Sequence, residues 1–140
     1  MSGKVSDIDI AAILIALKIK EESKDEILGA AKIMRKKSLK ISSPENCIDT
    51  CGTGGDMKGT LNISTASAIV AASAGVYVAK HGNRSITSKS GSADILEKLG
   101  LKLTSNRKEL EKSLNNKNFC FMFAQYHHEA MKFVINVRKN

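Results

Sequence analysis

The apolar residues near the start of the chain recur every three or four positions, which is the period of one face of an α-helix. This pattern predicts a first helix over residues 7–20, with Asp7 as its N-cap. A second helix is predicted from Ser23, because Ser23 and Glu26 have the spacing of a capping box. Basic residues 35–37 would lie in its last turn, where positive charge complements the helix dipole. The chain is therefore expected to begin with helices.

Short apolar runs alternate with helical segments after Pro44, the only proline. The predicted strands are residues 47–49, 76–79 and 119–123, and the predicted helices are residues 63–74, 92–99, 106–114 and 129–138. The run at 119–123 is apolar throughout, as expected of a strand that is buried on both faces. Strands that alternate with helices predict a parallel α/β sheet. We expect a partial helical subdomain over residues 1–43 and a partial α/β domain over residues 44–140.

Charge and aromatic content narrow the class of ligand. The 140 residues include 22 Lys and Arg and 14 Asp and Glu, which gives a formal net charge of +8. A basic balance favours anionic partners, either small substrates or nucleic acid. The basic residues are spread along the chain and 4% of residues are aromatic, so a stacking platform for single strands is not expected. Small anionic substrates are therefore favoured over nucleic acid.

The sequence has the features of a cytoplasmic protein. It contains no apolar window of about 18 residues that would span a membrane. The first residues, MSGKVSD, do not have the basic and apolar regions of a signal peptide. Cys47, Cys51 and Cys120 are odd in number and form no Cys-x-x-Cys pair, so reduced thiols are expected.

A glycine-rich stretch, residues 48–65 (IDTCGTGGDMKGTLNIST), joins the first predicted strand to an Ala-rich helix. Glycine lets the backbone approach a ligand closely, and the N–H groups of such a turn and of the next helix N-terminus attract anions. The spacing matches neither the G-x-x-x-x-G-K-[ST] loop nor the G-x-G-x-x-G fingerprint. The stretch predicts a phosphate or pyrophosphate site, and the alternative is a glycine-rich connector without a ligand.

Polar clusters follow all three predicted strands, at the edge of the sheet where parallel α/β proteins bind ligands. They are the glycine-rich stretch, the segment KHGNRSITSKSGS and the segment AQYHH. One shared cleft is the simplest interpretation. The alternative for Lys80, His81 and Arg84 is a solvated basic loop. A metal site at His127 and His128 is not favoured, because adjacent histidines lack the i, i+4 spacing of a helical ligand pair.

Several motifs in this order and spacing resemble those of the anthranilate phosphoribosyltransferases of tryptophan biosynthesis. They are GTGGD, NIST, KHGNR and SGSAD, with FAQYHHEAM and NVRK near the end. The resemblance covers essentially the whole chain. It implies a nucleoside phosphorylase-like fold, in which a helical domain and an α/β domain enclose a cleft. It also implies Mg²⁺-dependent transfer of the phosphoribosyl group of 5-phosphoribosyl 1-pyrophosphate (PRPP) to the amine of anthranilate, with release of pyrophosphate.

The resemblance also implies the roles of individual residues. The PRPP site would comprise Gly52, Gly55, Asp56, Thr60, Asn62, Ser64, Thr65, Lys80, His81, Gly82, Asn83, Arg84, Ser88 and Ser92. The anthranilate site would comprise Gly52, Asn83, His128 and Arg138. Ser64 would also bind one Mg²⁺. No general acid or base is assigned, because an aromatic amine needs little deprotonation to attack.

The family pattern extends beyond both ends of this sequence, which is therefore expected to be an internal fragment. The acidic pair that binds a second Mg²⁺ in the family would follow the NVRK motif, and the family is commonly homodimeric through its helical domain. We expect the chain alone to be oligomeric or marginally soluble, without activity. Two alternatives remain open, a pyrimidine nucleoside phosphorylase of the same fold and a binding module without catalysis.

Overall fold

The computed structural model describes residues 3–51, 62–85, 91–134, 136 and 137. The chain divides into two compact units. One contains residues 1–39 and 128–140, and the other contains residues 40–127. The domain boundary predicted between residues 43 and 44 stays a prediction. Within the described part of the chain, no helix is both long and apolar enough to cross a membrane.

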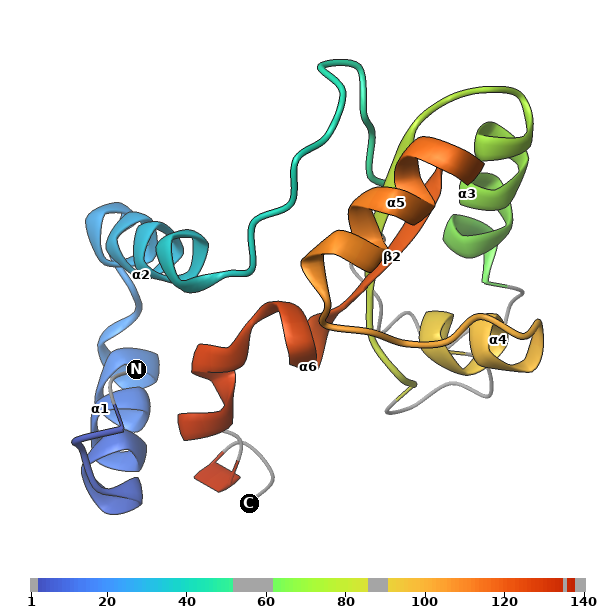
Figure 1. Ribbon diagram of the computed structural model, residues 1–140. Coiled ribbons are helices and arrows are strands. Elements are labelled where there is room, and N and C mark those ends of the chain that lie inside the picture. The colour runs from blue at the N-terminus through green and yellow to red at the C-terminus, as the bar shows by residue number, and fades with distance from the viewer. Residues whose placement is uncertain (1–2, 52–61, 86–90, 135, 138–140) are drawn as a thin grey trace. The chain divides into compact units, whose positions relative to one another are not determined.

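The first unit contains the two predicted N-terminal helices, α1 (Asp7–Lys20) and α2 (Lys24–Lys37) (Figure 1). The N-cap of α1 is Ser6 and not Asp7, because the Ser6 hydroxyl accepts the N–H of Asp9. The capping box of α2 is confirmed, with Ser23 and Glu26 each accepting the other's backbone N–H. None of the residues of α1 and α2, all of which the structure describes, is buried.

The helix predicted over residues 129–138 is confirmed only in part, because it is not one continuous α-helix in the described residues. Residues Glu129–Phe133 form a 3₁₀-helix, η1, in which the N–H of Met131 is donated to the carbonyl of His128 three residues earlier. Val134 then leaves the helical region, with φ −122° and ψ −1°. Residues 135 and 138 lie outside the described part of the chain.

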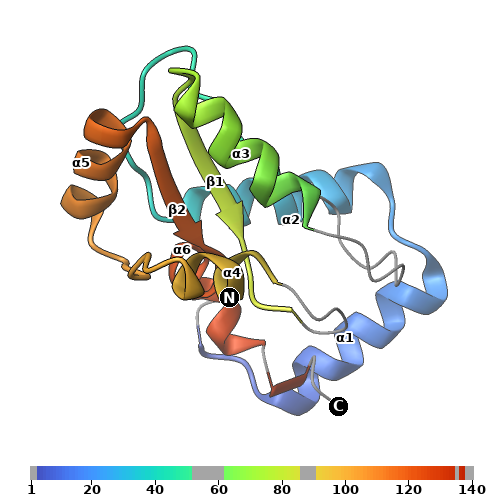
Figure 2. The same ribbon diagram turned by 90° about the vertical axis from the view of Figure 1, so that its right-hand side faces the viewer.

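The second unit is built on two parallel strands, β1 (Val78–Gly82) and β2 (Phe119–Phe123), which Figure 2 shows side by side. Val78 pairs with Phe119, and the register continues to Gly82 and Phe123. The strand predicted at 47–49 is reduced to a single parallel bridge between Ile48 and Val78. The β2 strand is confirmed, and three of its five residues are buried.

The bounds of β1 differ from the predicted 76–79. Helix α3 (Ile63–Ser73) ends in a Schellman motif, in which the N–H of Gly75 is donated to Ala72 and that of Val76 to Ala71. Gly75 has φ +92°, as this cap requires. Val76 therefore belongs to the helix cap, and the strand begins two residues later and continues through Lys80, His81 and Gly82.

Helices cover one face of the strand pair and the edge of β2. Ala68 and Ala72 of α3 pack on Val78, and α4 (Ser92–Lys98) places Ala93 and Leu96 against Phe121 and Phe123. Helix α5 (Arg107–Lys117) contacts β2 and extends three residues beyond the predicted end at 114. A single turn, α6 (Ala124–His127), follows β2. The fold class is confirmed: helices precede a small parallel α/β sheet.

Candidate functional site

Lys80 is the best-buried residue at the carboxyl end of β1, with 1% of its surface exposed. Its ammonium donates to the carbonyl and the hydroxyl of Thr50, at 3.3 and 3.4 Å, and to the hydroxyl of Ser64 at 3.3 Å. Burial lowers the pKa of Lys80, and the charge of Asp49 partly opposes this effect. The structure therefore holds a cation among neutral oxygens, and Lys80 is not part of a solvated loop.

Ser64 lies in the first turn of α3, where Asn62 is the N-cap. The Asn62 side-chain oxygen accepts the N–H of Thr65 and the hydroxyl of Ser64, both at 3.0 Å. Its amide donates to the hydroxyl of Ser92 at 3.2 Å, and the Thr65 hydroxyl donates to the same oxygen at 2.9 Å. Ser92 begins α4, so these bonds hold the N-termini of two helices together beside Lys80.

Gly82 at the end of β1 is required by close packing. A Cβ atom there would lie 2.9 Å from the ring of Phe121 and 3.0 Å from Cβ of Ser92. Both distances are shorter than ordinary carbon–carbon contacts, so a side chain would push β1 away from β2 and from the start of α4. Glycine thus lets the strand end pack closely against Ser92.

Arg84 is ion-paired with two carboxylates of α4. Its guanidinium donates to Asp94 at 3.0 Å and to both oxygens of Glu97 at 2.6 and 3.0 Å. It also lies over the ring of Phe123, 5.6 Å from the centroid. Asp94 accepts the N–H of Ser85 as well, and this bond is the main cause of the lowered pKa of Asp94. Arg84 therefore fixes the segment after β1 against α4.

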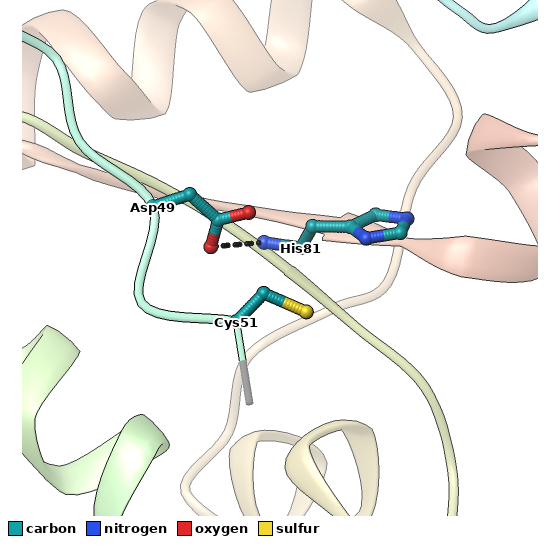
Figure 3. A group of neighbouring side chains, drawn as sticks. All are labelled: Asp49, Cys51 and His81. Carbon is teal, nitrogen blue, oxygen red and sulfur yellow. Dashed lines mark hydrogen bonds between the residues drawn. The ribbon is translucent and has the colours of Figure 1, made fainter. Parts of the chain in front are cut away.

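His81 follows Lys80 in β1 and is half-buried. Because successive side chains of a strand point to opposite faces, the His81 side chain lies on the face opposite to that of Lys80. Its backbone N–H donates to the carboxylate of Asp49 at 3.1 Å, and Figure 3 shows the thiol of Cys51 beside the same pair. Its imidazole makes an edge contact with His127, with ring centroids 5.3 Å apart. Burial lowers the pKa of His81, so the imidazole is neutral at pH 7.

The structure brings together a large part of the predicted PRPP site. Asn62, Ser64, Thr65, Lys80, His81, Gly82, Asn83, Arg84 and Ser92 all lie in the second unit, around the carboxyl end of β1 and the N-termini of α3 and α4. His128 belongs to the first unit. Gly52, Gly55, Asp56, Thr60, Ser88 and Arg138 lie outside the described residues. These assignments stay predictions.

Residues absent from the predicted site are central to its geometry. Thr50 accepts two bonds from Lys80, Asp49 accepts the N–H of His81, and Asp94 and Glu97 bind Arg84. Thr50 and Asp49 lie 30 and 32 residues away from Lys80 and His81 along the chain, so no local pattern identifies them as partners. Asp94 is the last residue of the SGSAD motif, but nothing in the sequence indicates that it and Glu97 bind Arg84.

A separate groove of about 620 Å³ lies beside the first residues of β2, between α3, α5 and the segment after α4. Its walls include Ile69, Leu99, Leu110 and Phe119, and none of the described site residues lines it. The groove is therefore distinct from the polar cluster at the carboxyl end of the sheet.

Residues 44–140 match the glycosyl transferase family, a/b domain, and residues 1–38 match the helical bundle domain of the same family. The chain belongs to the glycosyl transferase family. Both matches agree with the order of helices and sheet in the structure. Family membership therefore accounts for nearly the whole chain.

Relatives within this glycosyl transferase family confirm the resemblance that the motifs indicated. The chain is 53% identical over 137 residues to an anthranilate phosphoribosyltransferase of Saccharolobus solfataricus. It is similar to the crystal structure of the Thermus thermophilus anthranilate phosphoribosyltransferase, with a TM-score of 0.88 and 41% identity. It is also similar to that of Saccharomyces cerevisiae in complex with PRPP and Mg, with a TM-score of 0.82 and 32% identity.

The chain spans well under half the length of these proteins. The matches cover 98%, 99% and 95% of this chain, but 39%, 42% and 38% of the Saccharolobus, Thermus and Saccharomyces chains.

Proposed function

We propose that this chain contributes the PRPP site of an anthranilate phosphoribosyltransferase. The enzyme would transfer the phosphoribosyl group of PRPP to anthranilate, giving N-(5-phosphoribosyl)anthranilate and pyrophosphate in tryptophan biosynthesis. The family membership, the 53% identity to the Saccharolobus relative and the likeness to a structure in complex with PRPP and Mg support this proposal.

The observation that carries the proposal is the buried ammonium of Lys80 at the N-terminus of α3. Among the residues that the structure describes, its three bonds go to neutral oxygens of Thr50 and Ser64, which leaves its positive charge available to an anion. The first N–H groups of α3 and the positive end of its dipole favour negative charge at the same place. A pyrophosphate group carries the charge and the acceptor oxygens that such a site would bind.

The chemistry requires stabilisation of a leaving group more than proton transfer. The amine nitrogen of anthranilate would bond to C1 of the ribose while the bond from C1 to pyrophosphate breaks, and the amine proton would leave to solvent. Negative charge grows on pyrophosphate in the transition state, so donors already fixed around it lower the barrier. Asn62, Ser64, Thr65, Lys80 and Ser92 form such a fixed group, and Gly82 and Arg84 keep the neighbouring chain in position.

Mg²⁺ would bind with the substrate through Ser64. The Ser64 hydroxyl donates to Asn62 and accepts from Lys80, and a hydroxyl oxygen has a second lone pair that a hard cation can use. A single protein oxygen fits Mg²⁺, which commonly takes its other ligands from phosphates and water. When bound, Mg²⁺ would neutralise charge on the pyrophosphate.

The acceptor half of the proposal rests on Gly52, Asn83, His128 and Arg138. The planar guanidinium of Arg138 suits the anthranilate carboxylate, because it can bind both oxygens at once.

The proposed protein is a homodimer, with a helical domain over 1–43 followed by an α/β domain over 44–140. The family resemblance supports both the homodimer and this division into domains. The proposed location is the cytoplasm, which the three free thiols support.

The test is an assay of anthranilate consumption with PRPP and Mg²⁺. The enzyme for this assay would be a fusion of this chain with the segments of the Saccharolobus relative that lie outside the match. We expect turnover, and we expect Arg138→Ala to raise KM for anthranilate far more than KM for PRPP. Thymidine phosphorolysis in place of this activity would favour a nucleoside phosphorylase. PRPP binding without turnover would favour a binding module.

A further inference from the structure

The segment after the Ile48 bridge presents two different polar groups to β1. Thr50 faces Lys80, whose ammonium bonds to its carbonyl and hydroxyl. Asp49 and Cys51, on either side of Thr50, gather with His81 instead. Because alternate residues of a strand point to opposite faces, β1 separates the two groups. One side holds a cation among neutral oxygens, and the other collects a carboxylate, a thiol and an imidazole.

Asp49, Cys51 and His81 bring three potential metal-binding atoms to one place. A carboxylate oxygen, the thiol sulfur and an imidazole nitrogen all lie within 4.8 Å of one another (Figure 3). In a tetrahedral zinc site, ligand bonds of about 2.0–2.3 Å put such atoms roughly 3.3–3.8 Å apart. Side-chain rotations that bring the three ligand atoms about 1 Å closer together would therefore let them bind one ion.

The surroundings of these three residues favour metal binding over a chance grouping of side chains. One oxygen of Asp49 is fixed by the backbone N–H of His81, which orients the carboxylate and leaves its second oxygen for an ion. Asp49 and Cys51 are exposed, which gives an ion access from solvent.

The types of ligand atom select the kind of ion. A thiolate and an imidazole prefer Zn²⁺ and similar transition metals, whereas Mg²⁺ prefers oxygen ligands. A carboxylate and a thiolate together neutralise a divalent ion, which offsets the repulsion from the nearby Lys80. Three protein ligands also match zinc sites that keep a fourth position for water.

A nucleophilic Cys–His–Asp arrangement is a weaker interpretation of the same residues. In such enzymes the carboxylate binds the imidazole and sets its orientation. Here the hydrogen bond of Asp49 goes to the backbone N–H of His81.

We propose that Asp49, Cys51 and His81 form a binding site for a divalent transition-metal ion such as Zn²⁺, separate from the Mg²⁺ that would accompany PRPP. Binding forms a bond from sulfur to the metal and releases the thiol proton to solvent. Metal binding by these residues would not require that the protein transfers phosphoribosyl groups.

The first experiment titrates the protein with Co²⁺, whose bond to a thiolate gives a charge-transfer absorption band. We expect this band in the wild type and in Cys47→Ala, a matched control, because Cys47 is a half-buried cysteine of the same segment outside the group. Cys51→Ser should lose the band. Asp49→Asn and His81→Gln should bind Co²⁺ at least about tenfold more weakly, since losing even an outer-shell partner has effects of about 10- to 100-fold. Zn²⁺ should remove the band, and a large excess of Mg²⁺ should not.

The second experiment needs no variant and is therefore independent of folding defects. Alkylation of the thiols is followed by mass spectrometry with and without Zn²⁺. We expect Zn²⁺ to slow alkylation of Cys51 and to leave Cys47 unaffected. Equal protection of both thiols, a Co²⁺ band that survives Cys51→Ser, or unchanged affinity in both Asp49→Asn and His81→Gln would each overturn the proposal.

Discussion

Lys80 and Arg84 belong to the same KHGNR motif, yet the structure surrounds the two cations in opposite ways. The Lys80 ammonium is buried and bonds only to oxygens of Thr50 and Ser64 among the residues that the structure describes. The Arg84 guanidinium is exposed and is paired with two carboxylates of α4, Asp94 and Glu97. Two basic residues of one motif therefore have different electrostatic roles.

The difference indicates which cation is ready to bind an anion. A buried charge is costly unless it is paired, and the neutral partners of Lys80 compensate its charge only in part. An anion that reached Lys80 would gain a strong interaction in a region of low dielectric constant. An anion at Arg84 would first compete with Asp94 and Glu97. We therefore expect Lys80 to dominate PRPP binding and Arg84 to order the chain.

The largest expected effect is that of Lys80→Met on PRPP binding. The affinity in Mg²⁺ should fall about 10- to 100-fold, because a bond to a charged group is worth roughly 1.5–3 kcal/mol. The free energy of unfolding should be unchanged or higher, because a desolvated charge is replaced by an apolar chain of similar length. Titration calorimetry and urea denaturation would measure the two quantities. An unchanged PRPP affinity in this variant would show that Lys80 is not part of the PRPP site.

Ser64→Ala should have the next largest effect, because it removes an oxygen from Lys80 and from the proposed Mg²⁺ site. We expect PRPP affinity to fall by about 1.5–3 kcal/mol in the presence of Mg²⁺ and by less without it. Ser67→Ala is the matched control, since Ser67 is an exposed serine of the same helix. Calorimetric titration would detect the change. Equal losses in the two variants would argue against a specific role for Ser64.

Gly82 lies between the two cations, and its substitution tests the packing that joins their surroundings. Gly82→Ala should lower the free energy of unfolding by about 1–3 kcal/mol, because its Cβ would meet the ring of Phe121 and Cβ of Ser92. Gly29→Ala, in open space within α2, should instead raise it by roughly 0.5–1 kcal/mol. Urea denaturation compares the two. A Gly82→Ala variant as stable as the wild type would contradict the close packing.

Arg84→Gln should have the smallest effect on PRPP affinity of the three site variants. The substitution releases Asp94 and Glu97 and loosens the segment after β1, but the charge that it removes is already paired with these two carboxylates. The same calorimetric titration would measure the change, with Arg84→Lys as the variant that keeps the charge. A loss as large as that of Lys80→Met would show that Arg84 binds the ligand directly.

The elements with a strong local signal were predictable from sequence. The capping box at Ser23, the apolar run of β2 and the glycine that ends α3 each depend on residues close together in the chain. The class of fold and the grouping of the motifs at the strand ends followed from these elements. In these elements the residues that stabilise the local structure are the same residues that form the sequence pattern.

The environment of Lys80 was not predictable from sequence in this way. Thr50 and Ser64 lie 30 and 16 residues away from it along the chain, so a lysine that begins a polar segment looked like part of a loop. The same holds for the bond between Asp49 and His81, 32 residues apart. Strand β1 extends through these polar residues because distant groups satisfy them. Local patterns contain no information about such partners.

The most direct test of the role of Lys80 is a crystal structure of the protein with PRPP and Mg²⁺. We predict that the Lys80 ammonium leaves Thr50 and lies within about 2.7–3.2 Å of a pyrophosphate oxygen, while Arg84 stays paired with Asp94 and Glu97. A pyrophosphate bound to Arg84, with Lys80 still bonded to Thr50 and Ser64, would contradict this assignment.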